Sequence, residues 1–220
     1  MYNSNDVSVT AQKTLVKGMD NADHNTRTLL KSRFDENTLL VSRGSADNID
    51  PGSASLESGR SQIRAFDLSA VPSGGYNYGT SGKRIGWGLR NSVGVAEHPA
   101  TGGIYSVENS ADNIKRDGVD VHETNPGEEM NYHGTLRDNQ FAGQGGNYGY
   151  PTCLSAFEVD SLPNHGGMRT GSPFANSSSL DSLCKNTIAP KLVFPAHNAP
   201  LDIKFNNSGT EGWVTFHGSW

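Results

Sequence analysis

Three segments of this chain repeat one arrangement, in which an apolar strand, a polar turn, a second apolar strand and a short polar loop follow one another. The turns are built from Asp, Asn, Pro and Gly, the residues that favour tight reversals of the backbone. The paired strands are expected at 28–30 with 39–41, at 92–96 with 104–107, and at 200–205 with 213–216. The pattern predicts three antiparallel hairpins.

The composition supports an all-β fold. Glycine accounts for 26 of the 220 residues, and glycine destabilises helices by roughly 1 kcal/mol per residue relative to alanine. Helical bundles and coiled coils are therefore excluded. The hairpins end near Ser45, Ser110 and Ser219, and the longer second interval leaves room for a further unit. Propeller blades of four strands take about 40–50 residues each, so the pattern favours a segment of a β-propeller.

Polar residues of similar type precede each hairpin at a similar distance. His24 lies 21 positions before Ser45, Arg90 lies 20 positions before Ser110, and His197 lies 22 positions before Ser219. In an antiparallel hairpin, the residue that enters the first strand and the residue that leaves the second lie at the same end. We therefore expect His24, Arg90 with Asn91, and His197 to face one central site.

Charge and hydropathy exclude two classes of partner. The net charge is −5, and the 18 Lys and Arg residues are scattered, so the chain lacks the basic footprint of a nucleic-acid-binding protein. No apolar stretch approaches the roughly 18 residues that span a bilayer, so no membrane association is expected. Residues 1–6 lack the charged start and apolar core of a signal peptide, and we expect none in this chain.

The two cysteines, Cys153 and Cys184, form one disulfide at most, or remain two buried thiols. Two sequons for N-glycosylation begin at Asn176 and Asn206, and they favour a secreted parent protein. Four stretches between the hairpins are rich in Gly, Ser or acidic residues and are expected to be loops that carry function or cap an opening, at 52–60, 72–88, 115–137 and 162–183.

Several motifs together resemble one family. The most specific is Gly-Leu-Arg-Asn-Ser-Val-Gly at 88–94, followed by His-Pro-Ala-Thr-Gly at 98–102 and Glu-Asn-Ser-Ala-Asp at 108–112. Further matching stretches lie at 23–30, 128–131, 145–151, 196–203 and 216–220. In this order they resemble the soluble quinoprotein sugar dehydrogenases. The likeness is greatest to the fungal pyrroloquinoline quinone (PQQ)-dependent pyranose dehydrogenases, which are related to sorbosone dehydrogenase.

The resemblance implies a six-bladed β-propeller with the cofactor across the axial mouth. Only about three to four blades are expected within residues 1–220, which form a partial quinoprotein dehydrogenase domain that is truncated at both ends. An incomplete propeller leaves open sheet edges, which are a liability for stability.

The resemblance also assigns roles to residues of the expected central site. His24 matches the family's general base, and Asp23 beside it would orient the imidazole or bind a substrate hydroxyl. Arg90 and Asn91 match the pair that contacts the quinone, where a guanidinium stabilises negative charge on a quinone oxygen. His197 is a candidate for lining the cofactor site, with a structural role as the alternative.

Calcium is the metal that the resemblance implies, bound by main-chain carbonyls at Ser110 and Ala111, where bacterial members carry Gly-Pro. Carbonyl oxygens are ligands that calcium prefers. Glu128, Glu129 and Asn131 are candidates for bracing this loop. The remaining histidines are expected in loops without the spacing of a zinc site, at His122, His133 and His165.

The function implied is PQQ- and calcium-dependent oxidation of a pyranose or aldose, with hydride passing from the sugar to the quinone and the substrate proton passing to His24. Electrons would leave to a cytochrome domain or another redox protein, and the parent protein would be extracellular. Two alternatives remain open. One is a non-catalytic binding propeller or inactive fragment. The other is a calcium-dependent lactonase-like hydrolase, which would use side-chain oxygens from Asn109, Asp112 and Asn131.

Overall fold

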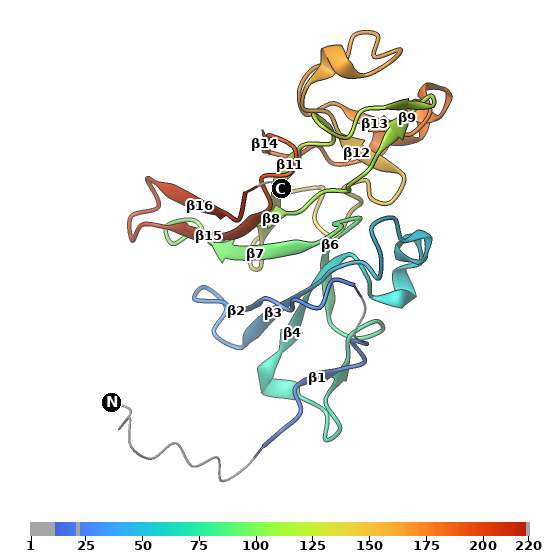
Figure 1. Ribbon diagram of the computed structural model, residues 1–220. Helices are drawn as coiled ribbons and strands as arrows, with labels where there is room; N and C mark the ends of the chain where they lie inside the picture. The colour runs from blue at the N-terminus through green and yellow to red at the C-terminus, as the bar shows by residue number, and fades with distance from the viewer. Residues whose placement is uncertain (1–11, 21–22, 219–220) are drawn as a thin grey trace.

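The fold was analysed in a computed structural model that describes residues 12–20 and 23–218. The regular secondary structure of this part of the chain is mainly β-strand, and its helices are all of the 3-10 type (Figure 1). None of these helices is long or apolar enough to cross a membrane. Ser219, the expected end of the third hairpin unit, lies outside the described residues.

The first hairpin belongs to a four-stranded antiparallel sheet in which strand order follows chain order. The sheet contains β2 (Leu29–Lys31), β3 (Thr38–Arg43), β4 (Gln62–Asp67) and β6 (Lys83–Trp87). Short helices η1 (Pro51–Ala54) and η2 (Leu56–Ser58) connect β3 to β4, and η3 (Leu68–Ala70) follows β4. A two-residue pair, β1 (Val16–Lys17) with β5 (Tyr76–Asn77), is parallel.

The second hairpin belongs to a second sheet with the same antiparallel meander. It contains β7 (Ser92–Glu97), β8 (Gly103–Glu108), β11 (Glu128–Thr135) and β14 (Leu192–Phe194). Long excursions separate its strands, with β9 (Lys115–Arg116) and β10 (Val119–Asp120) before β11. After β11 the chain forms β12 (Cys153–Ser155), η4 (Val159–Ser161), β13 (Pro173–Ala175) and η5 (Ser178–Asn186).

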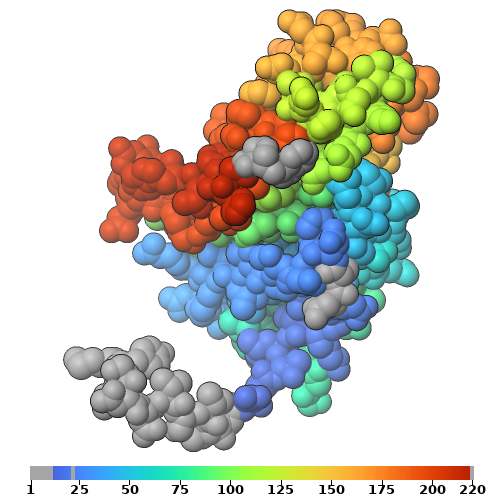
Figure 2. Space-filling model, viewed as in Figure 1, coloured from blue at the N-terminus to red at the C-terminus, as the bar shows by residue number. Residues whose placement is uncertain are grey.

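The third hairpin, β15 (Pro200–Phe205) with β16 (Gly212–Phe216), packs on the second sheet through β7 and β8 (Figure 2). Strand β7 also contacts β2 and β3 of the first sheet. Buried aliphatic side chains, including Leu40, Ile63 and Ile104, fill the space between the two sheets. The first strands of all three hairpins are therefore neighbours, which brings their entry ends together.

The structure places strands in three of the expected loops. The stretch 72–88 contains β5 and β6, the stretch 115–137 contains β9, β10 and all of β11, and the stretch 162–183 contains β13 and the start of η5. Strand β11 was missed because it starts with two glutamates, which are common on solvated surfaces. His133 is consequently not in a loop but on β11, fully buried, with Nε2 2.8 Å from Ser106 Oγ. Burial lowers its pKa to about 3.

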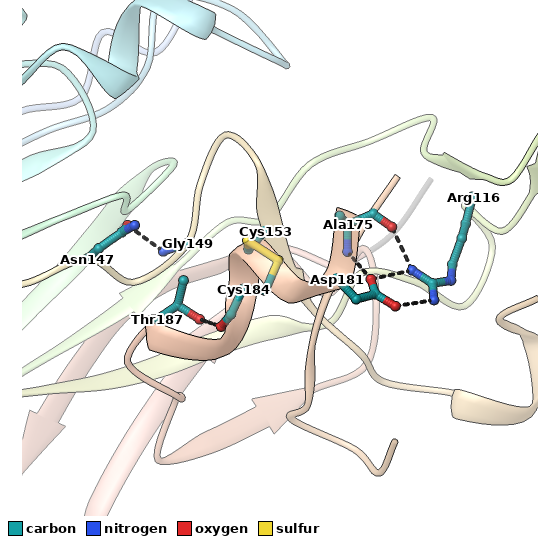
Figure 3. Close-up of a disulfide and its surroundings, with 8 residues drawn as sticks. All are labelled: Arg116, Asn147, Gly149, Cys153, Ala175, Asp181, Cys184 and Thr187. Carbon is teal, nitrogen blue, oxygen red and sulfur yellow. Dashed lines mark hydrogen bonds and ion pairs between the residues drawn. A yellow bond between two sulfur atoms is a disulfide. The ribbon is translucent and has the colours of Figure 1, made fainter. Parts of the chain in front are cut away.

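The stretch 162–183 folds back onto the segment around β12, and together they form a separate lobe, which we call the disulfide lobe. Its core includes Leu154, Leu162 and Phe174. Cys153 and Cys184 form a disulfide that joins β12 to η5 (Figure 3). Beside it, the buried Arg116 guanidinium donates to Asp181 Oδ2 at 2.7 Å and to the Ala175 carbonyl at 2.7 Å. The disulfide thus ties η5 to β12, and the ion pair ties η5 to β9.

We expect reduction of the Cys153–Cys184 disulfide to lower the free energy of unfolding by roughly 3–4 kcal/mol, because the closed loop restricts the unfolded chain. Urea unfolding of the oxidised and reduced protein measures the difference. The variant Cys153→Ala/Cys184→Ala serves as the control, since a reductant should leave its unfolding midpoint unchanged. Equal midpoints for oxidised and reduced wild type would contradict the expectation.

Candidate active site

A pocket of about 390 Å³ lies at the shared end of the three hairpins, where β2, β7 and β15 begin. It collects most of the residues predicted from the sequence, namely Asp23, His24, Arg90, Asn91, Ser110 and His197. Ala111 is the exception, because its side chain is buried in the apolar core of the disulfide lobe. The pocket is also lined by Asn48, Asn109, Asp112, Asn113, Glu128 and His217.

The hydrogen bonds of His24 fix its tautomer. Its Nδ1 lies 2.8 Å from Ser45 Oγ and 3.2 Å from the Ser45 carbonyl oxygen. The Ser45 hydroxyl donates its single proton to the Asp47 carbonyl at 2.7 Å, so it accepts from His24. Nδ1 therefore carries the proton, and Nε2 of neutral His24 has an available lone pair. This is the arrangement that a general base needs.

The surroundings of His24 favour the neutral imidazole. Burial, and then the positive charge of Arg90, lower its pKa below the ordinary value of 6.5, against an opposing effect of the Asp23 carboxylate. A lowered pKa keeps the ring unprotonated down to a lower pH. The site thus holds a base that is ready to accept a proton at neutral pH.

The Arg90 side chain is buried, and all three of its guanidinium nitrogens donate hydrogen bonds. Its Nε donates to the Asn48 carbonyl at 3.0 Å and Nη2 donates to Asn48 Oδ1 at 2.8 Å. Nη2 also lies 3.5 Å from Asp112 Oδ2, and Nη1 donates to the Asn109 carbonyl at 3.3 Å. One N–H of Nη1 has no partner among the described residues, so a fixed cation faces the pocket.

Asn48 is the site residue that the sequence analysis missed. Its Oδ1 also accepts from the Asp112 N–H at 2.8 Å, and its Nδ2 donates to the Asp112 carbonyl at 2.7 Å. One amide therefore holds both Arg90 and the loop after β8. A signal was present, because Ser-Ala-Asp-Asn-Ile occurs at 45–49 and again at 110–114. These two identical pentapeptides follow equivalent strands, β3 and β8.

Glu128 braces the loop at Ser110, as predicted, and also the loop at Ala199. Its Oε2 accepts from the Ser110 N–H at 2.6 Å and its Oε1 accepts from the Ala199 N–H at 3.2 Å. Burial raises the pKa of Glu128 to about 7. Among the described residues, no hydrogen bond joins Glu129 or Asn131 to the loop at Ser110. Glu129 Oε2 instead accepts from Asn131 Nδ2 at 2.9 Å within the sheet.

Glu108, a second residue that the sequence analysis missed, supports the pocket from the end of β8. Its Oε1 accepts from the Arg90 N–H at 2.6 Å, and its side chain is buried. Burial, together with the neighbouring Glu129 carboxylate, raises the pKa of Glu108 well above its usual range. Glu108 thus fixes the backbone of Arg90 while Asn48 fixes the side chain.

His197 both lines the pocket and ties it together. Its backbone φ is 61°, in the left-handed region. Its Nε2 donates to the His122 carbonyl at 2.5 Å, and its Nδ1 lies 3.3 Å from Asp112 Oδ1. The Asp112 carboxylate therefore stands between His197 and Arg90 at the pocket wall.

Several oxygen atoms of main-chain carbonyls and carboxylates lie at or beside the pocket. Among the described residues, no group of three or more His, Cys, Asp or Glu side chains is arranged to hold a metal. The carbonyl oxygens of Ser110 and Ala111 accept no hydrogen bond from the described residues. The carboxylates of Asp112 and Glu128 also line the pocket, and carbonyl and carboxylate oxygens are the kinds of ligand that calcium prefers.

We expect His24 to be the Nδ1–H tautomer and to titrate below pH 6.5. Replacing Arg90 by Gln should raise the pKa of His24, because the substitution removes a positive charge that disfavours the imidazolium. Long-range ¹H–¹⁵N NMR across a pH series reports both properties. Arg84→Gln is the matched control, because Arg84 donates to the Gly145 carbonyl, away from this pocket. An Nε2–H tautomer would contradict the assignment.

Asn48→Ala should lower the free energy of unfolding by about 1–3 kcal/mol, because it leaves Arg90 Nη2 and the Asp112 N–H without their partner. Urea unfolding measures the loss. Asn113→Gly is the control at the equivalent position of the second pentapeptide, where the φ of 54° is well suited to glycine. Equal losses for the two variants would show that Asn48 has no special role.

The comparisons with known proteins agree with one another. The TrAA12-like family model matches residues 1–220. A PQQ-dependent sugar dehydrogenase of Hypocrea jecorina is 50% identical over 222 residues, covering 98% of this chain and 51% of that protein. A PQQ-dependent pyranose dehydrogenase of Coprinopsis cinerea is 37% identical over 229 residues, covering 100% of this chain and 31% of that protein. The chain thus spans about half of the length of the first relative and about a third of the second.

Solved structures show the same likeness. An iodide structure of a Trichoderma reesei protein of carbohydrate-active enzyme family AA12 superposes with a TM-score of 0.92 at 51% identity, covering 100% of this chain and 55% of that one. The holo form of the Coprinopsis cinerea pyranose dehydrogenase PQQ domain superposes with a TM-score of 0.86 at 37% identity, covering 94% of this chain and 52% of that one. On sequence and structure alike, the chain belongs to the TrAA12-like family.

Proposed function

We propose that this chain forms part of a PQQ- and calcium-dependent sugar dehydrogenase, in which His24 is the base. The observation that carries the proposal is the pairing, in one pocket, of a neutral His24 with available Nε2 and a fixed Arg90 guanidinium. Removing hydride from a sugar carbon requires a base for the hydroxyl proton and an electron acceptor. The names of both relatives, which include PQQ dependence, support the choice of acceptor.

The architecture proposed is a six-bladed propeller, to which the described residues would contribute two four-stranded blades and part of a third, where three to four were expected from the sequence. The two four-stranded meanders have the strand order of propeller blades. Hairpin β15–β16 would form the inner half of a third. The share of the relatives' length that the chain covers, about half or less, supports an incomplete ring.

The residues of the pocket fit the implied cofactors. PQQ is a planar, anionic quinone, and Arg90 and Asn91 offer a cation and an amide at the wall of a cavity whose size is typical of ligand sites. The carbonyls of Ser110 and Ala111 would hold calcium, and a calcium structure exists for the Trichoderma reesei protein. When bound, the quinone supplies the two-electron acceptor and calcium supplies a Lewis acid that polarises it.

The chain's own residues would position the sugar and move its proton. His24 Nε2 accepts the proton of the hydroxyl that is oxidised, and Ser45 stabilises the resulting imidazolium through Nδ1–H. Asp23 accepts a hydrogen bond from a neighbouring sugar hydroxyl. Arg90 would stabilise negative charge that develops on the group bound beside its guanidinium. Asn48 keeps the guanidinium in place, so that it need not reorient during the reaction.

The partners proposed are a pyranose or aldose substrate and an electron acceptor, either a cytochrome domain or another redox protein. We further propose that the parent protein is extracellular. The Cys153–Cys184 disulfide supports this location, since disulfides persist in oxidising compartments and are rare in the cytosol.

Titration with PQQ in the presence of calcium, followed by absorbance, tests the proposal. Wild type should bind saturably, and Arg90→Gln should weaken binding by roughly 10- to 100-fold, as expected for loss of a charge-assisted hydrogen bond. His24→Gln should retain binding and lose sugar-driven reduction of the quinone. His98→Gln is the control, because His98 lies in the turn at the opposite end of β7 and should behave as wild type. Folded wild type that binds no quinone would refute the proposal for this chain.

A further inference from the structure

Two sequons occur in the chain, and the structure places them in different surroundings. One is Asn176-Ser177-Ser178, directly after β13 in the disulfide lobe. The other is Asn206-Asn207-Ser208, in the turn between β15 and β16. A glycan must coexist with the fold that carries it, so these surroundings decide which asparagine can bear one.

Asn176 presents its side chain to solvent from a fixed backbone. The residue is exposed, and its amide makes no hydrogen bond within the described part of the chain. Its carbonyl accepts from the Asp117 N–H at 2.9 Å, and Asp117 Oδ1 accepts from the Ser178 N–H at 2.9 Å. Asp117 therefore anchors the backbone on both sides of Asn176, while the Nδ2 atom stays accessible.

Asn206 uses its amide to close a turn. Its Nδ2 donates to Thr210 Oγ1 at 3.0 Å and to Glu211 Oε2 at 3.3 Å, so both amide protons are engaged. The same turn packs on the neighbouring hairpin, where the Gly209 carbonyl lies 2.9 Å from His98 Nε2. Bonding a sugar to Nδ2 would remove one of these protons and place a bulky group against that contact. A β-hairpin forms within about 1–10 μs, so the Asn206 amide is engaged in these hydrogen bonds as soon as the hairpin has formed.

We propose that Asn176 is an N-glycosylation site and that Asn206 stays unmodified in the folded protein. The donor is a lipid-linked oligosaccharide of the secretory pathway. A bond forms between Asn176 Nδ2 and the anomeric carbon, while the bond from that carbon to the lipid pyrophosphate breaks. The pyrophosphate is the leaving group, Nδ2 loses one proton to solvent, and nothing is oxidised or reduced. The disulfide supports passage through an oxidising compartment, where this donor is found.

The position of Asn176 gives the glycan a physical role. Helix η5 follows the sequon and exposes two large apolar side chains, Leu180 at 45% and Leu183 at 60%. A hydrophilic glycan beside them would shield this apolar surface from self-association. The lobe that carries β13 lies apart from the hairpin ends that border the pocket, so the glycan leaves the pocket open (Figure 1). The inference is independent of the proposed dehydrogenase activity.

Expression of the full chain behind a secretion signal in yeast tests the proposal. Peptide mass mapping, after an endoglycosidase that leaves one sugar residue on each modified asparagine, reports which sites are occupied. Wild type should carry the remnant on Asn176 only. Asn176→Gln and Ser178→Ala should each abolish glycosylation of the chain. Asn206→Gln should leave it unchanged, as should the matched control Asn207→Gln, which preserves that sequon.

Secreted and microsomal fractions are both mapped, so that a variant that folds poorly is still scored. Unmodified Asn176 in folded wild type would overturn the proposal, and occupancy of Asn206 equal to that of Asn176 would overturn the selectivity. Glycan removal from native wild type provides a second readout, because it should increase self-association in light scattering. No increase would overturn the shielding role.

Discussion

The guanidinium of Arg90 is the constraint around which the rest of the site is arranged. A charge removed from water destabilises the fold unless hydrogen bonds replace its hydration, and breaking such a set costs several kcal/mol. The backbone N–H of Arg90 donates to Glu108, and the Arg90 carbonyl accepts from the Ser45 N–H at 2.8 Å. The Arg90 side chain bonds Asn48, Asn109 and Asp112. One residue thus fixes the end of β3, the start of β7 and the end of β8. Burial, and then the positive charge of Arg90, lower the pKa of His24.

The parts of the fold that depend on local pattern could be predicted from the sequence. Alternating apolar residues and turn-forming residues placed the three hairpins, and the similar distances of His24, Arg90 and His197 from the hairpin ends placed all three at one pocket. The prediction of one pocket succeeded because hairpin geometry fixes which residues lie at the same end of a hairpin. That geometry does not depend on the longer connections between hairpins. The connections themselves were read as loops, although β6 and β11 lie within them.

The missed features depend on contacts between residues far apart in the chain. Glu128 and Glu129 begin β11 in the interior because backbone N–H groups and Asn131 meet their carboxylates, and no local pattern encodes those partners. Asn48 owes its role to Arg90, 42 positions later. The disulfide was one of two options until the lobe brought Cys153 and Cys184 together, because cysteine count alone limits the number of disulfides and does not establish one.

The repeated Ser-Ala-Asp-Asn-Ile shows how identical residues acquire different roles from their position. In the first copy, Ser45 fixes the His24 tautomer and Asn48 binds Arg90. In the second, Ser110 is held by Glu128 and Asp112 is bound by the asparagine of the first copy. Only one of the two asparagines has its amide in this junction, so the copies complement each other instead of acting alike. The two copies thus contribute different contacts to one pocket.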